Sequence, residues 1–82
     1  MYFVYALYSS KSDKIYIGYS ENPEKRLQSH NDERNKGWTR KFQPWKLVYT
    51  EECATKTAAL KREKQLKTAA GRRFVWELIK NN

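Results

Sequence analysis

Hydrophobic and polar positions alternate in three segments of the chain and predict three β-strands. Residues 2–8 are apolar at both alternating sets of positions, which is typical of a strand covered on both faces. The polar residues 9–13 have the composition of a turn, and the β-rich residues 15–19 follow them. The first two strands should therefore pair as an antiparallel hairpin. Alternation over residues 45–50 predicts the third strand.

The residues after the second predicted strand have the signals of a helix start. Asn22 is a suitable N-cap, Pro23 would occupy the first helical position, and Glu24 would place a negative charge in the first turn. We expect this helix to end near His30. The following residues 31–44 are polar and basic and predict a long loop, and loops of this length are usually functional or mobile.

Two more helices are predicted in the last third of the chain. Residues 57–67 are strong helix formers, and Thr68 is a suitable N-cap for a last helix that ends near Ile79, although Gly71 weakens its first turn. No repeat or linker composition is visible, so residues 1–82 are expected to form a single domain. The predicted fold class is α+β, with a three-stranded antiparallel sheet flanked by helices.

The composition favours a polyanionic partner inside the cell. Lys and Arg number 17 against 9 Asp and Glu, and the formal net charge of +8 favours nucleic acid through counterion release. A merely basic soluble protein is the alternative. The single Cys53 cannot form an internal disulfide, which suits a reducing compartment. Without a basic leader or an apolar run near the roughly 20 residues of a spanning helix, we expect a cytoplasmic protein with no membrane partner.

Glu63 is an unusual acidic residue within a predicted apolar helix stripe. Ala59, Leu60 and Leu66 form this inward stripe, and Glu63 falls at a position within it. Because burial of an unpaired charge is costly, the carboxylate should be paired or bound to a metal. The alternatives to a metal are an ion pair with Arg26 and a hydrogen bond to a tyrosine.

Two pairs of residues have the chemistry to handle a phosphate. Arg26 and His30 are one helical turn apart, hence on one helix face, and a guanidinium can bind two phosphate oxygens. Taken alone, each would be a surface residue, with Arg26 beside Glu24. Tyr5 and Tyr16 lie in the two hairpin strands, where isolated tyrosines are usually core residues.

Taken together, these residues resemble the motifs of the GIY-YIG nuclease family. A Phe-Val-Tyr triplet ends at Tyr5, and a Tyr-Ile-Gly triplet begins at Tyr16, eleven positions later. Arg26 follows after ten more positions, and His30 and Glu63 complete the set. The resemblance extends over most of the chain and is closest to the small stand-alone members of the family. It implies the same α+β fold that the hydrophobic pattern predicts.

The resemblance also implies a role for each of these residues. The Tyr5 and Tyr16 hydroxyls would converge on one phosphate, with Tyr5 as the general base for the attacking water, and Arg26 would stabilise the developing charge. His30 would assist proton transfer or orient a tyrosine, and Glu63 would hold Mg²⁺ or Mn²⁺, since Mg²⁺ takes few carboxylates and keeps its waters. A phenol with a pKa near 10 is a poor base, so we expect neighbouring cations to lower the pKa of the tyrosine.

The implied activity is that of a metal-dependent endonuclease that hydrolyses phosphodiester bonds of nucleic acid, with DNA as the expected partner. The chain departs from the family pattern at two places. Phe3 replaces the first glycine, and residues 75–78 fill the region where larger members carry an asparagine. The second departure keeps open the alternative of a non-catalytic nucleic-acid-binding module that retains the nuclease fold. Because no helix-turn-helix or zinc-finger motif is recognisable, a catalytic subunit that needs a separate targeting protein is a further alternative.

Further basic and aromatic residues are candidates for nucleic-acid contact outside the motifs. The first candidates are Lys36, Trp38, Arg40, Lys41 and Arg62. The wider basic set also contains Lys46, Lys61, Lys64, Lys67, Arg72 and Arg73. Basic residues on a helix are as readily explained as its solvated face. For Trp38, the two hypotheses are stacking on a base and anchoring of the loop to the protein body.

Overall fold

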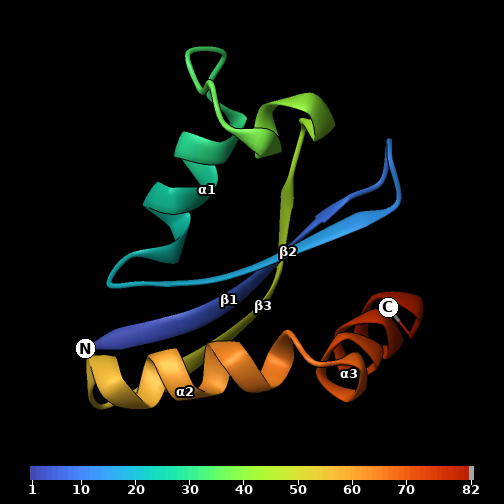
Figure 1. Ribbon diagram of the computed structural model, residues 1–82. Coiled ribbons are helices and arrows are strands. Elements are labelled where there is room, and N and C mark those ends of the chain that lie inside the picture. Colours follow the sequence, from blue (N-terminus) through green and yellow to red (C-terminus); the bar gives the residue numbers. More distant parts are fainter. Residues whose placement is uncertain (82) are drawn as a thin grey trace.

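The computed structural model describes residues 1–81 and contains the predicted antiparallel sheet. Its strands are β1 (Tyr2–Ser9), β2 (Lys14–Ser20) and β3 (Lys46–Cys53), in the order β2-β1-β3 (Figure 1). The central β1 pairs antiparallel with both neighbours. The third strand is longer than its alternating pattern indicated, because β1 continues to pair with it as far as Cys53.

The three predicted helices are present, and the two predicted N-caps form. They are α1 (Pro23–Asn31), α2 (Lys56–Leu66) and α3 (Ala69–Lys80). The Asn22 side chain accepts a hydrogen bond from the main-chain N–H of Lys25. The Thr68 side chain accepts one from the main-chain N–H of Gly71. These bonds satisfy N–H groups that have no partner inside the helix. The predicted α+β fold is confirmed.

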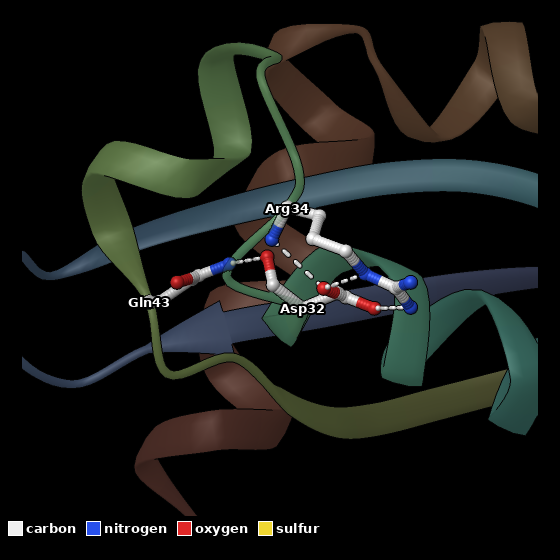
Figure 2. A network of polar contacts seen from close by, with 3 residues as sticks. All are labelled: Asp32, Arg34 and Gln43. Carbon is white, nitrogen blue, oxygen red and sulfur yellow. Dashed lines mark hydrogen bonds and ion pairs between the residues drawn. The ribbon is translucent and has the colours of Figure 1, made fainter.

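The segment 31–44 is more ordered than a long loop, because it contains the 3-10 helix η1 (Trp38–Phe42). Its ends are fixed by polar contacts that Figure 2 shows. Gln43 Nε2 donates to the main-chain oxygen of Asp32 at 2.9 Å, and the Arg34 guanidinium binds the Asp32 carboxylate at 2.8 and 3.1 Å. The segment is thereby folded back against the end of α1.

Helices cover both faces of the sheet, with α1 and η1 on one face and α2 and α3 on the other (Figure 1). Buried side chains therefore form two clusters. The cluster toward α2 and α3 contains Val4, Ala6, Ile15, Ile17, Cys53, Ala59, Leu66 and Val75. The cluster toward α1 and η1 contains Tyr5, Leu7 and Trp45. The central strand is buried on both sides, as its doubly apolar pattern predicted.

Gly71 allows α3 to begin directly beside the end of α2. A Cβ atom at this position would collide with the main-chain oxygen of Gln65 and with the Cα atom of Leu66. The glycine that weakens the helix intrinsically is thus required by the close approach of the two helices. The tight junction brings the Arg72 side chain next to Lys67, whose main-chain oxygen accepts from Arg72 Nε at 3.2 Å.

Candidate active site

Tyr5 extends from the central strand across its neighbour β2. It pairs with Gly18, and a Cβ atom at Gly18 would lie only 2.9 Å from the Tyr5 hydroxyl. The phenol therefore occupies the space above Gly18, which a larger residue would fill. Gly18 lies inside β2, and the absence of a side chain at this position leaves room for the Tyr5 ring.

The Tyr5 hydroxyl meets two other aromatic side chains over this face of the sheet. It lies 3.3 Å from His30 Nε2, at hydrogen-bond distance. The ring centroids of Tyr16 and His30 are 4.6 Å apart, and those of Tyr5 and Tyr16 are 6.3 Å apart. Side chains from β1, β2 and α1 are thus brought together, although up to 25 residues separate them in the sequence.

Thr39 fixes the other side of the His30 ring. Its Oγ1 atom lies 3.0 Å from His30 Nδ1 and accepts a hydrogen bond from Asn35 Nδ2 at 2.7 Å. Both Thr39 and His30 are 6% exposed, so neither polar contact competes with water. Sequence reasoning did not select Thr39, because nothing in its polar surroundings distinguishes it before the segment folds back onto α1.

His30 is held in its neutral form at neutral pH. Burial is the larger cause that lowers its pKa, and the Arg26 charge lowers it further. A neutral imidazole has one donor and one acceptor. In the tautomer that donates from Nδ1 to Thr39, Nε2 is free to accept a hydrogen bond from the Tyr5 hydroxyl.

The pKa of Tyr5 is raised, which differs from the expected lowering by cations. Burial is the main cause of the rise, the Arg26 guanidinium opposes it, and the charges of Tyr16 and Glu63 add to it. Burial outweighs the single neighbouring cation, so Tyr5 is a protonated phenol at neutral pH. A base role for Tyr5 therefore requires a group that accepts its own proton.

The Arg26 guanidinium lies beside the tyrosine hydroxyls and remains charged. Contact with the Tyr5 hydroxyl is the main cause that raises its pKa. Within residues 1–81, neither Glu24 nor Glu63 forms an ion pair with it. Its side chain is exposed, so the charge is available to an anion from solution.

Glu63 belongs to α2, and α2 covers the face of the sheet opposite to α1 (Figure 1). Its charge nevertheless reaches Tyr5 and contributes to the raised pKa of that residue. The carboxylate is largely shielded, with 15% of the side chain exposed, and lies 3.8 Å from the Lys67 ammonium. The structural partner of Glu63 is thus Lys67, and the alternative pair with Arg26 does not form.

The residues around Glu63 suit a hydrated divalent ion better than a fully coordinated one. No group of three His, Cys, Asp or Glu side chains lies within metal-binding reach in the part of the chain that the structure describes. One shielded carboxylate is enough for Mg²⁺, which takes few protein ligands and retains its waters. Glu63 would thus be the single protein ligand of such an ion, with water as the other ligands.

An open cleft of about 340 Å³ lies beside these side chains. Its lining includes Tyr16, Arg26, His30, Asn35 and Trp38. Lys36, Arg40 and Lys41 are exposed in and before η1, on the same segment as Trp38. Trp38 is itself 52% exposed, whereas Trp45 is buried and donates from Nε1 to the main-chain oxygen of Thr39 at 2.7 Å. Trp45, and not Trp38, is the main anchor of this segment.

Arg62 is not brought to the other candidate residues. Its Nε atom donates to Glu51 Oε1 at 3.1 Å, and Glu51 belongs to β3, the edge strand opposite β2. Its guanidinium also donates to Gln65 at 3.2 Å. The structure thus gives Arg62 a local role in holding α2 against β3.

A comparison with models of protein families identifies the family of this chain. The model of the GIY-YIG catalytic domain matches residues 1–74. The chain belongs to the GIY-YIG family. The domain is that of a nuclease family, and the match contains every residue of the candidate site, from Tyr5 to Glu63.

Small proteins of bacteria and archaea are similar to this GIY-YIG chain. A UPF0213 protein of Staphylococcus saprophyticus is 41% identical over 58 residues, which cover 71% of each chain. A UPF0213 protein of Natronomonas pharaonis is 36% identical over 67 residues, 82% of this chain and 78% of the relative. The resemblance to small GIY-YIG proteins is confirmed. Among the helices within residues 1–81, none has the length and apolar character needed to cross a membrane.

Proposed function

We propose that this GIY-YIG protein is a metal-dependent endonuclease that hydrolyses phosphodiester bonds of nucleic acid, with DNA as the expected substrate. One observation carries the proposal. Tyr5, Tyr16 and His30 converge from three elements, and the unpaired, exposed cation of Arg26 lies beside them. Such an arrangement suits a bound phosphate, because it combines proton donors and acceptors with a fixed positive charge.

The protonation states support a two-residue base. Tyr5 is protonated and His30 is neutral, and their polar atoms are 3.3 Å apart. As water attacks phosphorus, the Tyr5 oxygen takes the proton of the water while its own proton passes to His30 Nε2. Thr39 stabilises the imidazolium by accepting from Nδ1. In this proposal the general base is the Tyr5–His30 pair and not Tyr5 alone.

The remaining residues stabilise charge on the phosphate. Tyr16 donates its hydroxyl to a non-bridging oxygen, and Arg26 binds the oxygens whose negative charge grows in the transition state. Glu63 would hold the divalent ion, which when bound supplies Lewis-acid stabilisation of the phosphate charge. The proposed centre thus combines residues of β1, β2 and α1 with the carboxylate of Glu63 on α2, whose charge affects the pKa of Tyr5.

A nicking assay tests the proposal. Supercoiled plasmid is incubated with the native protein and Mg²⁺ or Mn²⁺, beside Glu63→Gln and Arg26→Ala. We expect Glu63→Gln to abolish nicking while the fold is kept, because the amide keeps the shape and loses the ligand charge. Arg26→Ala should slow nicking by on the order of a hundredfold, as for comparable donors to a developing charge.

Matched controls make the outcome decisive. Glu52→Gln removes a carboxylate from the exposed β3 edge and Lys25→Ala removes a cation from an exposed position on α1, and both should nick at the native rate. If the native protein nicks no faster than Glu63→Gln in either metal, the endonuclease proposal is wrong and the binding-module alternative replaces it. Incubating the native protein and the same metals with a labelled RNA hairpin tests whether RNA is also cleaved.

A further inference from the structure

A second hollow of about 510 Å³ follows the outer edge of β2, next to the candidate site. Its walls come from the hairpin, from η1 and from the junction of α2 with α3, three regions far apart in the sequence. We call it the β2-edge groove and define it by the residues Lys14, Tyr16, Trp38, Lys67, Arg72 and Trp76. None of the motif residues except Tyr16 belongs to it.

The charge of the groove suits a phosphate backbone. Its lining contains three cationic side chains, of which Lys67 also forms the 3.8 Å ion pair with Glu63, and the carboxylate of Asp13. Asp13 accepts a hydrogen bond from the Tyr8 hydroxyl at 3.1 Å, and its single negative charge leaves the lining net positive. Arg72 uses only its Nε atom in a contact with the main chain of Lys67, so its terminal N–H groups can bind an anion.

The groove also presents two tryptophans. Trp38 is 52% exposed and is supported from one side by Phe42, with ring centroids 4.7 Å apart. Trp76 is half-buried and packs edge to face on Tyr8, with centroids 5.7 Å apart. Aromatic rings supported in this way are rigid platforms for bases, and stacking on them tolerates any sequence. Bases paired in a duplex are already stacked on one another, so such platforms select unpaired nucleotides.

The β2-edge groove continues into the cleft of the candidate active site. Tyr16 and Trp38 line both hollows, and the cleft also contains Arg26 and His30. A strand that lies in the groove therefore leads directly to the position proposed for the scissile phosphate. The groove combines basic residues with tryptophans, which is the combination that binds a single strand.

We propose that the β2-edge groove binds an unpaired segment of a nucleic-acid strand next to the bond that is cut. Its phosphates contact Lys14, Lys67 and Arg72, and its bases stack on Trp38 and Trp76. This inference rests on the proposed function for the position of the cut, but the binding itself does not depend on catalysis. The substrate class is therefore nucleic acid with a single-stranded segment, such as a flap, loop or frayed end.

The experiment measures binding without cleavage. Fluorescein-labelled dT15, rU15 and a 15-base-pair duplex are titrated with the full chain in EDTA at one fixed salt concentration, by fluorescence anisotropy. We expect at least one of the two single strands to bind about tenfold tighter than the duplex and to quench the tryptophan fluorescence. The comparison of dT15 with rU15 shows which sugar the groove accepts.

Matched variants assign the binding to the groove. Arg72→Gln and Trp76→Leu should each weaken single-strand binding by roughly tenfold, the amount that loss of one stacked base or one phosphate contact produces. Arg73→Gln removes the same charge one position away, outside the groove lining, and should change binding much less. Thermal unfolding confirms that each variant is folded, and Trp38→Leu gives a second stacking test should Trp76→Leu unfold.

Two results would overturn the inference. Either the protein binds the duplex as tightly as both single strands, or Arg72→Gln weakens single-strand binding no more than Arg73→Gln does. The failure of the proposed function looks different. In that case the native protein does not nick plasmid with any metal, yet single strands still bind through Arg72 and Trp76 in EDTA. Nicking without a preference for single strands refutes the groove inference alone.

Discussion

Tyr5 and Gly18 are complementary in shape at the centre of the site. The tyrosine hydroxyl lies so close to Gly18 that a Cβ atom at position 18 would be only 2.9 Å from it. The hydroxyl is thereby placed within 3.3 Å of His30, whose ring is held from the other side by Thr39. The chemistry of the site thus depends on residues that touch no phosphate themselves, a glycine and a buried threonine among them.

Thr39→Val tests the positioning of His30. Valine keeps the volume of threonine but removes the oxygen at 3.0 Å from His30 Nδ1, so the imidazolium that forms in the proposed reaction loses its partner. We expect the nicking rate to fall by roughly tenfold, since an unsatisfied buried group costs about 1–3 kcal/mol. The acidic limb of the pH–rate profile should also shift, because this contact tunes the basicity of His30.

Two further variants separate a positioning role from a structural one. Thr39→Ser restores the hydroxyl and should recover most of the rate, whereas Thr50→Val, at an exposed position of β3, should leave both rate and pH profile unchanged. An unshifted pH profile in Thr39→Val, even with a lower rate, would assign Thr39 to packing alone.

At the scale of the elements, local signals in the sequence were sufficient for most of the fold. The N-caps Asn22 and Thr68 and the doubly apolar first strand act within a few residues, so they can be recognised without the tertiary structure. The helix η1 was missed because some of its contacts are distant in sequence, such as the hydrogen bond from Ser9 Oγ to the main-chain oxygen of Phe42 at 2.6 Å. The motif residues were selected through the family resemblance. Thr39 belongs to no motif, and its contact with His30 forms only when the segment folds back onto α1.

The ion-pair partners of Glu63 and Arg62 differ from the sequence hypotheses. Glu63 was placed correctly on the inward side of its helix, but its ion-pair partner is Lys67, the C-cap residue of α2, and not Arg26. Arg62 was considered for nucleic acid, yet Glu51 holds it at the other edge of the sheet. The spacing of Glu63 and Lys67 is that of neighbours on a helix surface, so this pair could have been predicted from the sequence. The pair of Arg62 with Glu51 joins a helix to a strand, and no local spacing indicates it.

Gly71→Ala tests the junction of α2 and α3. In an ordinary helix this change would be stabilising, but here the new methyl group would collide with the end of α2. We expect the free energy of unfolding to fall by about 1–3 kcal/mol, as for other overpacked contacts. Denaturant unfolding measures it, with Ala70→Ser at an exposed neighbouring position as the control. A more stable Gly71→Ala protein would mean that the helices are not packed this closely.

At the scale of the whole molecule, the site lies where two layers meet an edge strand. The helices α1 and α2 cover opposite faces, and β2 forms one edge of the sheet between them (Figure 1). His30 connects this architecture, since it contacts Tyr5 of the sheet through one nitrogen and Thr39 of η1 through the other. A change in the charge of this one buried side chain therefore affects the stability of the entire domain.

The stability of the domain should accordingly depend on pH through His30. Burial, and next the Arg26 charge, lower the pKa of His30 in the folded state, whereas the unfolded chain takes up the proton near the ordinary value of about 6.5. Below that pH the unfolded state binds more protons, so the free energy of unfolding falls as the pH decreases and levels off below the lowered pKa. The chain contains 1 histidine, and the ordinary pKa values of carboxylate and lysine side chains lie outside this pH range. The expected pH dependence is therefore assigned to His30. Urea unfolding between pH 7.5 and 5.5 measures the effect, and His30→Gln should remove it.

A native protein that becomes more stable toward pH 5.5 would show that His30 is charged in the folded state. The proposed transfer of a proton from Tyr5 to a neutral imidazole would then be wrong.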